Sequence, residues 1–211
     1  GTGTWSPTLF KLSKRAGEGS CVPPLTTPPN YHTVPPPGTA PLRYRDLVFG
    51  SATVSSDIVY GSAVNNSGQT VTLRLDLYQP TGDTVSERPA IVWVHGGSFS
   101  SGSKTSAELV DEATTFARKG YVNVSISYRL EPGGCSASGV TATCIIAINE
   151  AMADAQTAVR FLRANAALYG IDVDRIAIGG TSAGAITALH VAFRSSEDTT
   201  AAVAAAVSLS G

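Results

Sequence analysis

The sequence has few charged residues and no apolar run long enough to cross a membrane. Charged side chains make up 15% of the 211 residues and the formal net charge is −1. There is therefore no excess of basic side chains that would favour nucleic acid or an anionic membrane as a partner. The longest apolar runs, such as residues 201–207, are far shorter than the roughly 20 residues of a membrane span. The remaining composition, 43% hydrophobic, is typical of one globular domain with a sizeable core.

Methionine is also scarce. It occurs once, at Met152, and the chain begins at Gly1. Because a primary translation product begins with methionine, we expect that a leader has been removed or left out. A secretory signal peptide is the usual reason, so the sequence predicts a secreted or extracytoplasmic protein.

Cysteine is limited to three residues. Cys135 and Cys144 enclose a loop of small residues, which suits a local disulfide in an oxidising compartment. We predict this disulfide; the alternative is two unpaired buried thiols. Cys21 is then either free or paired with a segment that this chain lacks.

Proline is concentrated near the N-terminus, with eight prolines between residues 23 and 41. Such a stretch sustains neither helix nor sheet pairing and favours an extended conformation. We predict a proline-rich arm over residues 1–41, packed on the surface of a domain that spans residues 42–211. The alternatives are a linker from a preceding module and a ligand for a proline-binding partner.

Hydrophobic periodicity predicts the elements of that domain. Alternating or continuous apolar residues indicate strands at 71–78, 90–94, 122–128, 175–178 and 202–209. Helical spacing indicates helices at 109–117, at 151–169 with an end at Gly170, and at 182–194. Strands and helices alternate from Ala90 onward, so the sheet there should be parallel with helices on both faces. The predicted fold is α/β, a three-layer αβα sandwich whose mostly parallel sheet has an antiparallel start.

One short motif carries the chemistry. Residues 180–184 read Gly-Thr-Ser-Ala-Gly, between an apolar strand and a helical stretch. A Gly-x-Ser-x-Gly run in that context is the signature of a nucleophile elbow, a tight turn that exposes the serine hydroxyl. The motif alone is weak evidence, but its position between strand and helix makes Ser182 a candidate nucleophile. The helix dipole there favours developing negative charge.

A second motif, His-Gly-Gly-Ser-Phe at residues 95–99, directly follows the apolar strand 90–94. Acyl transfer places negative charge on the carbonyl oxygen, and backbone N–H groups must be ready to meet it. A glycine-rich loop at the carboxyl end of a parallel strand can supply them. The alternative is a plain glycine turn.

The two motifs, together with Ser-Tyr-Arg-Leu at 127–130 and Tyr-Gly-Ile-Asp at 169–172, resemble the α/β-hydrolase fold. Within it, the chain is similar to carboxylesterases of the hormone-sensitive-lipase and type-B kind over about residues 70–211. The resemblance implies that Ser182 is the nucleophile, that Gly96, Gly97, Ser98 and Ala183 form the oxyanion hole, and that His95 holds its loop in shape. It implies no cofactor or metal. Ser98 departs from the pattern, since many relatives carry a third glycine there.

The histidine base and the acid of this family come after the serine, and this chain has only 29 residues after Ser182. His190 lies about 12 Å of helix rise from Ser182, too far to be its base. Asp154 and Asp172 are expected to pair or cap structurally, and Glu197 and Asp198 to lie in a solvated loop. His32 falls in the proline-rich arm.

We therefore expect the N-terminal portion of a secreted serine carboxylesterase that acts on small esters. Its C-terminal strands, with the acid and the histidine, are missing from this chain, and the apolar strand 202–209 would expose an edge to receive them. The alternatives are a non-catalytic relative that binds a small molecule in the same pocket, and an esterase-like adhesion module, for which we find no positive feature.

Overall fold

The computed structural model describes residues 40–135 and 139–210. The proline-rich arm predicted for residues 1–41, together with Cys21 and His32, lies almost wholly outside these ranges. The strands are β1 (Ala52–Val64), β2 (Thr70–Pro80), β3 (Arg88–Val94), β4 (Val122–Ile126), β5 (Ile171–Thr181) and β6 (Ala205–Leu209). The helices are α1 (Ala107–Arg118), α2 (Ala142–Ala164), α3 (Ala166–Tyr169) and α4 (Ala183–Phe193), with a 3₁₀ turn at Thr199–Ala201.

The strands form one mixed sheet in the order β1-β2-β4-β3-β5-β6. β1 pairs with β2 and β2 with β4 in antiparallel fashion, whereas β4, β3, β5 and β6 run parallel to one another. The predicted mostly parallel sheet with an antiparallel start is confirmed. Its parallel part brings the ends of β3 and β5 side by side, because Val94 pairs with Gly180.

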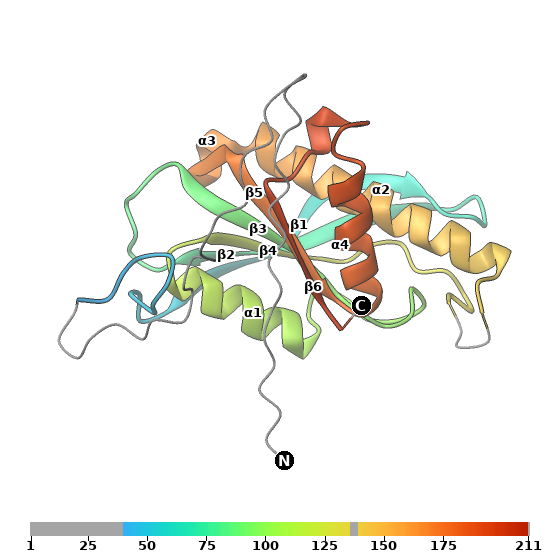
Figure 1. The fold of residues 1–211 in the computed structure, drawn as a ribbon, viewed down its shortest axis with the longest axis horizontal. Helices are drawn as coiled ribbons and strands as arrows, with labels where there is room; N and C mark the ends of the chain where they lie inside the picture. Colours follow the sequence, from blue (N-terminus) through green and yellow to red (C-terminus); the bar gives the residue numbers. More distant parts are fainter. Residues whose placement is uncertain (1–39, 136–138, 211) are drawn as a thin grey trace, which may run out of the picture.

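Helices cover both faces of the sheet, with α1 on one side and α2 and α4 on the other (Figure 1). The central strand β3 shows why. Its side chains Ile91 and Trp93 pack in the cluster that includes α1, while Val92 and Val94 pack in the larger cluster with α2 and α4. A strand buried on both faces reads as a continuous apolar run, and the three-layer architecture is confirmed.

Several element boundaries differ from the predicted ones. The helix predicted from 151 begins at Ala142, because Thr141 caps it by accepting a hydrogen bond from the Cys144 N–H at 3.1 Å. It breaks at Asn165, and the short helix α3 follows and ends at Gly170, which has φ +63°. These boundaries depend on single capping residues, which hydrophobic periodicity does not detect.

Two predicted strands are shorter than expected. β4 ends at Ile126 rather than at residue 128, and its polar Asn123 and Ser125 are buried. Asn123 is tolerated there because its Oδ1 accepts a hydrogen bond from Trp93 Nε1 at 3.0 Å. β6 begins at Ala205 rather than at residue 202, since the Asp198-capped 3₁₀ turn precedes it. No helix in the described residues combines the length and the apolar character that a membrane span requires.

Candidate active site

Ser182 occupies a strained turn between β5 and α4. Its backbone has φ +51° and ψ −116°, a combination that a residue with a side chain rarely adopts. The turn is held from both sides: the Ser182 N–H donates to the Leu209 carbonyl of β6 at 3.0 Å, and the Ser182 carbonyl accepts from Ile186 N–H at 3.1 Å. The Ser182 side chain is exposed. The structure thus has the turn that the Gly-x-Ser-x-Gly motif predicts.

The two glycines of the motif are required by close backbone packing. A Cβ atom at Gly180 would lie 2.5 Å from the Val94 carbonyl oxygen and 2.6 Å from the carbonyl carbon of Gly184. A Cβ atom at Gly184 would overlap the Val94 carbonyl itself. The start of α4 therefore sits directly against the end of β3, which leaves the intervening serine as the residue that projects outward.

The Ser182 hydroxyl is not engaged in the described part of the chain. It makes no capping hydrogen bond to α4, although serine is a favoured N-cap. The N–H groups of Ala183 and the rest of the first turn have no partner inside the helix. An unused hydroxyl thus stands beside unused backbone donors at the positive end of a helix dipole.

The His95 loop, defined here as residues 95–101, lies against this turn. A Cβ atom at Gly96 would be 3.2 Å from Ser182 Cβ and 3.1 Å from the Thr181 carbonyl oxygen. The next three residues all have positive φ: +110° at Gly97, +53° at Ser98 and +61° at Phe99. Only glycine adopts this conformation without cost, so the loop is strained at Ser98 and Phe99.

Three carbonyl groups in the middle of the His95 loop accept hydrogen bonds that fix its orientation. The Gly97 carbonyl accepts from the N–H groups of Ser100 and Ser101 at 3.0 and 3.1 Å. The Ser98 and Phe99 carbonyls accept from the N–H groups of Cys135 and Glu131 at 2.9 and 3.0 Å. Across residues 40–135 and 139–210, the N–H groups of Gly97 and Ser98 donate to no acceptor. The loop therefore keeps donors free next to Ser182.

His95 fills the inside of its own loop. It is fully buried, its Nδ1 lies 2.6 Å from the Gly96 carbonyl oxygen, and its ring stacks on Tyr128 at 4.2 Å between centroids. The Tyr128 hydroxyl in turn donates to the His95 carbonyl at 3.1 Å. Burial lowers the pKa of His95, which favours the neutral imidazole. The ring thus packs inside the loop that it belongs to, and the supporting role that the resemblance implies for His95 stays a prediction.

The remaining candidate acids lie in structural pairs. Asp154 is buried and holds Arg129, whose Nη2 is 2.8 Å from Asp154 Oδ1. Asp172 pairs with Arg175 on the surface. Asp198 caps the 3₁₀ turn and pairs with Arg160 at 2.7 Å, so it is not simply a solvated residue as predicted. Glu197 is exposed.

His190 does not reach Ser182. It lies near the end of α4, eight residues along the helix from Ser182, and its backbone carbonyl accepts the Arg194 N–H. Among the described residues, no three His, Cys, Asp or Glu side chains gather as metal ligands would.

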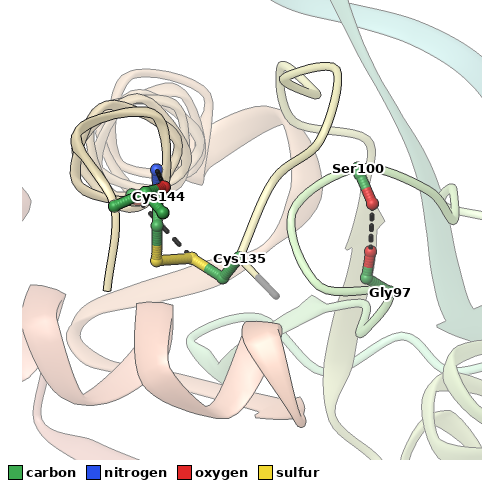
Figure 2. Close-up of a disulfide and its surroundings, with 5 residues drawn as sticks. Gly97, Ser100, Cys135 and Cys144 are labelled. Carbon is green, nitrogen blue, oxygen red and sulfur yellow. Dashed lines mark hydrogen bonds between the residues drawn. A yellow bond between two sulfur atoms is a disulfide. The ribbon is translucent and has the colours of Figure 1, made fainter. Parts of the chain in front are cut away.

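A disulfide joins Cys135 to Cys144, the pair expected from the sequence (Figure 2). Cys144 is in the first turn of α2, and Cys135 ends the turn that contacts the Ser98 carbonyl. Figure 2 shows the His95 loop beside this bond, with the Ser100 hydroxyl donating to the Gly97 carbonyl at 3.3 Å. Sequence reasoning singled out the two cysteines but missed Glu131 and Gly134, because nothing in the local pattern marks them as neighbours of residues 98–100.

The sheet with its two helical layers and the Ser182 turn define an α/β-hydrolase. The profile of the BD-FAE family matches residues 75–207, which is more than half of the chain. The chain therefore belongs to the BD-FAE family.

Named relatives agree with this assignment. The chain is similar to phenmedipham hydrolase of Pseudarthrobacter oxydans, with 40% identity over 54% of this chain and 21% of that protein. It is similar to carboxylesterase 3B of Mus musculus, with 35% identity over 53% of this chain and 19% of the relative. Bile salt-activated lipase of Rattus norvegicus is 30% identical over 64% of this chain and 21% of the relative.

Among solved structures, esterase 2 of Thermogutta terrifontis, phosphorylated by paraoxon, has a TM-score of 0.50 and 30% identity over 72% of this chain and 51% of that one. The matched region thus spans about a fifth of these three curated relatives and about half of the solved esterase.

Proposed function

We propose that this chain supplies the nucleophile and the oxyanion hole of a carboxylic-ester hydrolase that works through an acyl-enzyme. The observation that carries the proposal is the exposed Ser182 in a strained turn, next to N–H groups of the His95 loop and of α4 that have no acceptor within the described part of the chain. Membership of the BD-FAE family supports it. So do the names of the similar proteins, which are a hydrolase, a carboxylesterase, a lipase and an esterase.

In the proposed reaction, Ser182 Oγ adds to the ester carbonyl carbon while its proton passes to a histidine base. The carbonyl oxygen becomes an oxyanion that accepts hydrogen bonds from the N–H groups of Gly97, Ser98 and Ala183. The bond to the alcohol oxygen then breaks, and the base returns the proton to the leaving alcohol. Water attacks the acyl-enzyme by the same route, which releases the carboxylic acid and regenerates Ser182.

The base and its acid partner are proposed to come from a segment of the same gene product that follows residue 211. Two observations support this. His95 is enclosed by its own loop, and His190 lies about 12 Å of helix rise from Ser182. In addition, β6 pairs only with β5 within the described residues, so its other edge can accept a further strand.

The test compares two proteins: residues 1–211 alone and the product of the complete open reading frame. We expect the complete product to hydrolyse short-chain aryl esters such as p-nitrophenyl butyrate. Residues 1–211 should retain only the small residual catalysis of an oxyanion hole without a base. A separately expressed C-terminal segment should restore turnover. Equal activity from residues 1–211 alone would show that the base lies within this chain.

Ser182→Ala should abolish turnover and labelling by a fluorophosphonate probe in the complete product. Ser56→Ala is the matched control, because Ser56 is an exposed serine in β1. If the unmutated complete product neither reacts with the probe nor turns over any ester, yet binds a small molecule at Ser182, the chain is a non-catalytic relative.

We also propose that the protein works in an oxidising, extracytoplasmic compartment. The disulfide between Cys135 and Cys144 supports this, because such bonds persist outside the reducing cytosol. The measurement is intact mass with thiol alkylation, without reductant, on protein recovered from the medium or periplasm of its native host. Alkylation of both cysteines, or recovery from the cytosol alone, would contradict the proposal.

A further inference from the structure

The segment 129–135, called the brace here, is attached to α2 at both ends. At its start, the Arg129 guanidinium holds Asp154 at 2.8 Å and Glu150 at 3.1 Å. At its end, the disulfide joins Cys135 to Cys144. In the middle, Glu131 is buried, and burial first, then the neighbouring Glu131 carboxylate, raise the pKa of Glu150 despite Arg129.

The brace contacts the His95 loop with its backbone. The Cys135 N–H donates to the Ser98 carbonyl at 2.9 Å, and the Glu131 N–H donates to the Phe99 carbonyl at 3.0 Å. Between them, Gly134 is so close that a Cβ atom there would overlap the Ser98 carbonyl and lie 2.9 Å from Ser100 Cβ. The brace therefore holds the two residues of the loop that adopt positive φ without being glycine.

The held carbonyls determine where the free donors point. In a planar trans peptide, the N–H of one residue points opposite to the carbonyl of the residue before it. The direction of the Ser98 N–H is thus set by the Gly97 carbonyl, and the Ser98 and Phe99 carbonyls fix the chain that follows. Because Ser98 and Phe99 are strained at positive φ, they would relax toward ordinary backbone angles if the brace moved. The N–H groups of Ser100 and Ser101, which hold the Gly97 carbonyl, would move with them, and the Ser98 N–H would shift with that carbonyl.

We propose that the Cys135–Cys144 disulfide is a positioning element for the oxyanion hole, acting through the brace on the Ser98 and Phe99 carbonyls. This inference rests on the proposed function for its catalytic consequence. The sulfur atoms touch no substrate. They fix the C-terminal end of the brace to the start of α2, so that the Cys135 N–H stays in place.

The first test measures kinetics in the complete gene product with the double variant Cys135→Ser/Cys144→Ser. We expect kcat to fall about tenfold, because a misaligned oxyanion donor loses part of the hundredfold or greater effect of a lost one. KM should stay within about twofold, since the donors act on the transition state rather than on the bound ester. Val122→Ala is the control. It creates a cavity at the opposite end of β4 and should lower stability without this fall in kcat.

The second test does not depend on activity. Amide hydrogen exchange should accelerate at Glu131, Ser100 and Ser101 in the double variant, relative to core amides such as Val92 and relative to Val122→Ala. If the unmutated product hydrolyses no ester, the proposed function fails while this exchange still tests the brace. Unchanged kcat in an active enzyme, or unchanged exchange at these amides, overturns the inference. A loss of stability with no larger effect on kcat than Val122→Ala also overturns it.

Discussion

Gly184 of α4 and Val94 of β3 meet backbone to backbone, with no room for a methyl group between the Gly184 Cα and the Val94 carbonyl. Alanine normally favours a helix interior over glycine by about 1 kcal/mol, so propensity alone would make Gly184→Ala stabilising. We expect the opposite. The overlap should lower the free energy of unfolding by about 1–3 kcal/mol or more.

Urea denaturation of Gly184→Ala measures this directly. Gly50→Ala is the control, because a Cβ atom at Gly50 meets nothing within 4 Å; its stability should change by less than about 0.5 kcal/mol. Wild-type stability in Gly184→Ala would contradict the packing described for the start of α4.

The buried ion pair between Arg129 and Asp154 should matter far more than the surface pairs. Asp154 is 1% exposed and accepts hydrogen bonds from the Arg129 backbone N–H, Nε and Nη2. Arg129→Met would leave a buried carboxylate without its partner, at a cost of about 3–5 kcal/mol in unfolding free energy. Arg45→Met removes an exposed partner of Asp46 and should leave the urea midpoint nearly unchanged. Equal effects of the two variants would contradict this account.

Much of the fold could be predicted from the sequence, because long elements carry a clear period. The periodicity predicts β2, β3, α1 and α4 within about two residues of their bounds, since each packs an apolar face, whereas β5 extends beyond the predicted 175–178 at both ends. β1 was not located individually. It is an edge strand with mostly exposed residues and two breaks in its pairing register with β2, so it lacks the alternation that marks a half-buried strand.

The site was predictable only in part, for a related reason. Ser182 and the His95 loop are recognisable because tight turns constrain their neighbouring residues. The brace is not recognisable from the sequence. Its contacts with residues 98–100 join segments more than thirty residues apart, and they are made by backbone groups, which every residue carries. Nor does any local pattern match Arg129 to Asp154, which lie 25 residues apart.

The buried His95 should make the protein less stable in mild acid. Burial lowers its pKa below the ordinary value of 6.5. As pH falls below 6.5, the unfolded chain takes up a proton at this position and the folded chain does not. The free energy of unfolding therefore falls, by up to about 1.4 kcal/mol per pH unit for one proton, until the folded-state pKa is reached.

The measurement is urea unfolding between pH 7.5 and 5.5. His95→Gln should be less stable overall but should lose this component of the pH dependence. His190→Gln is the matched control for the loss of an imidazole, because His190 is only partly buried. A His95→Gln slope equal to that of the wild type would contradict the assignment.

The strain at Ser182 predicts that two inactivating substitutions differ in stability. At φ +51° and ψ −116°, any residue with a Cβ atom costs about 1–3 kcal/mol, whereas glycine does not. Ser182→Gly should therefore raise the free energy of unfolding by about 0.5–2 kcal/mol, after the greater freedom of glycine in the unfolded chain is subtracted. Ser182→Ala keeps the Cβ atom and removes a hydroxyl that makes no capping bond, so its stability should stay near that of the wild type.

Urea midpoints of the two variants decide the question. If Ser182→Gly is no more stable than Ser182→Ala, the turn is not strained. A gain confined to the glycine variant would mean that the exposed hydroxyl is maintained at a cost in stability, as expected of a residue kept for chemistry rather than for folding.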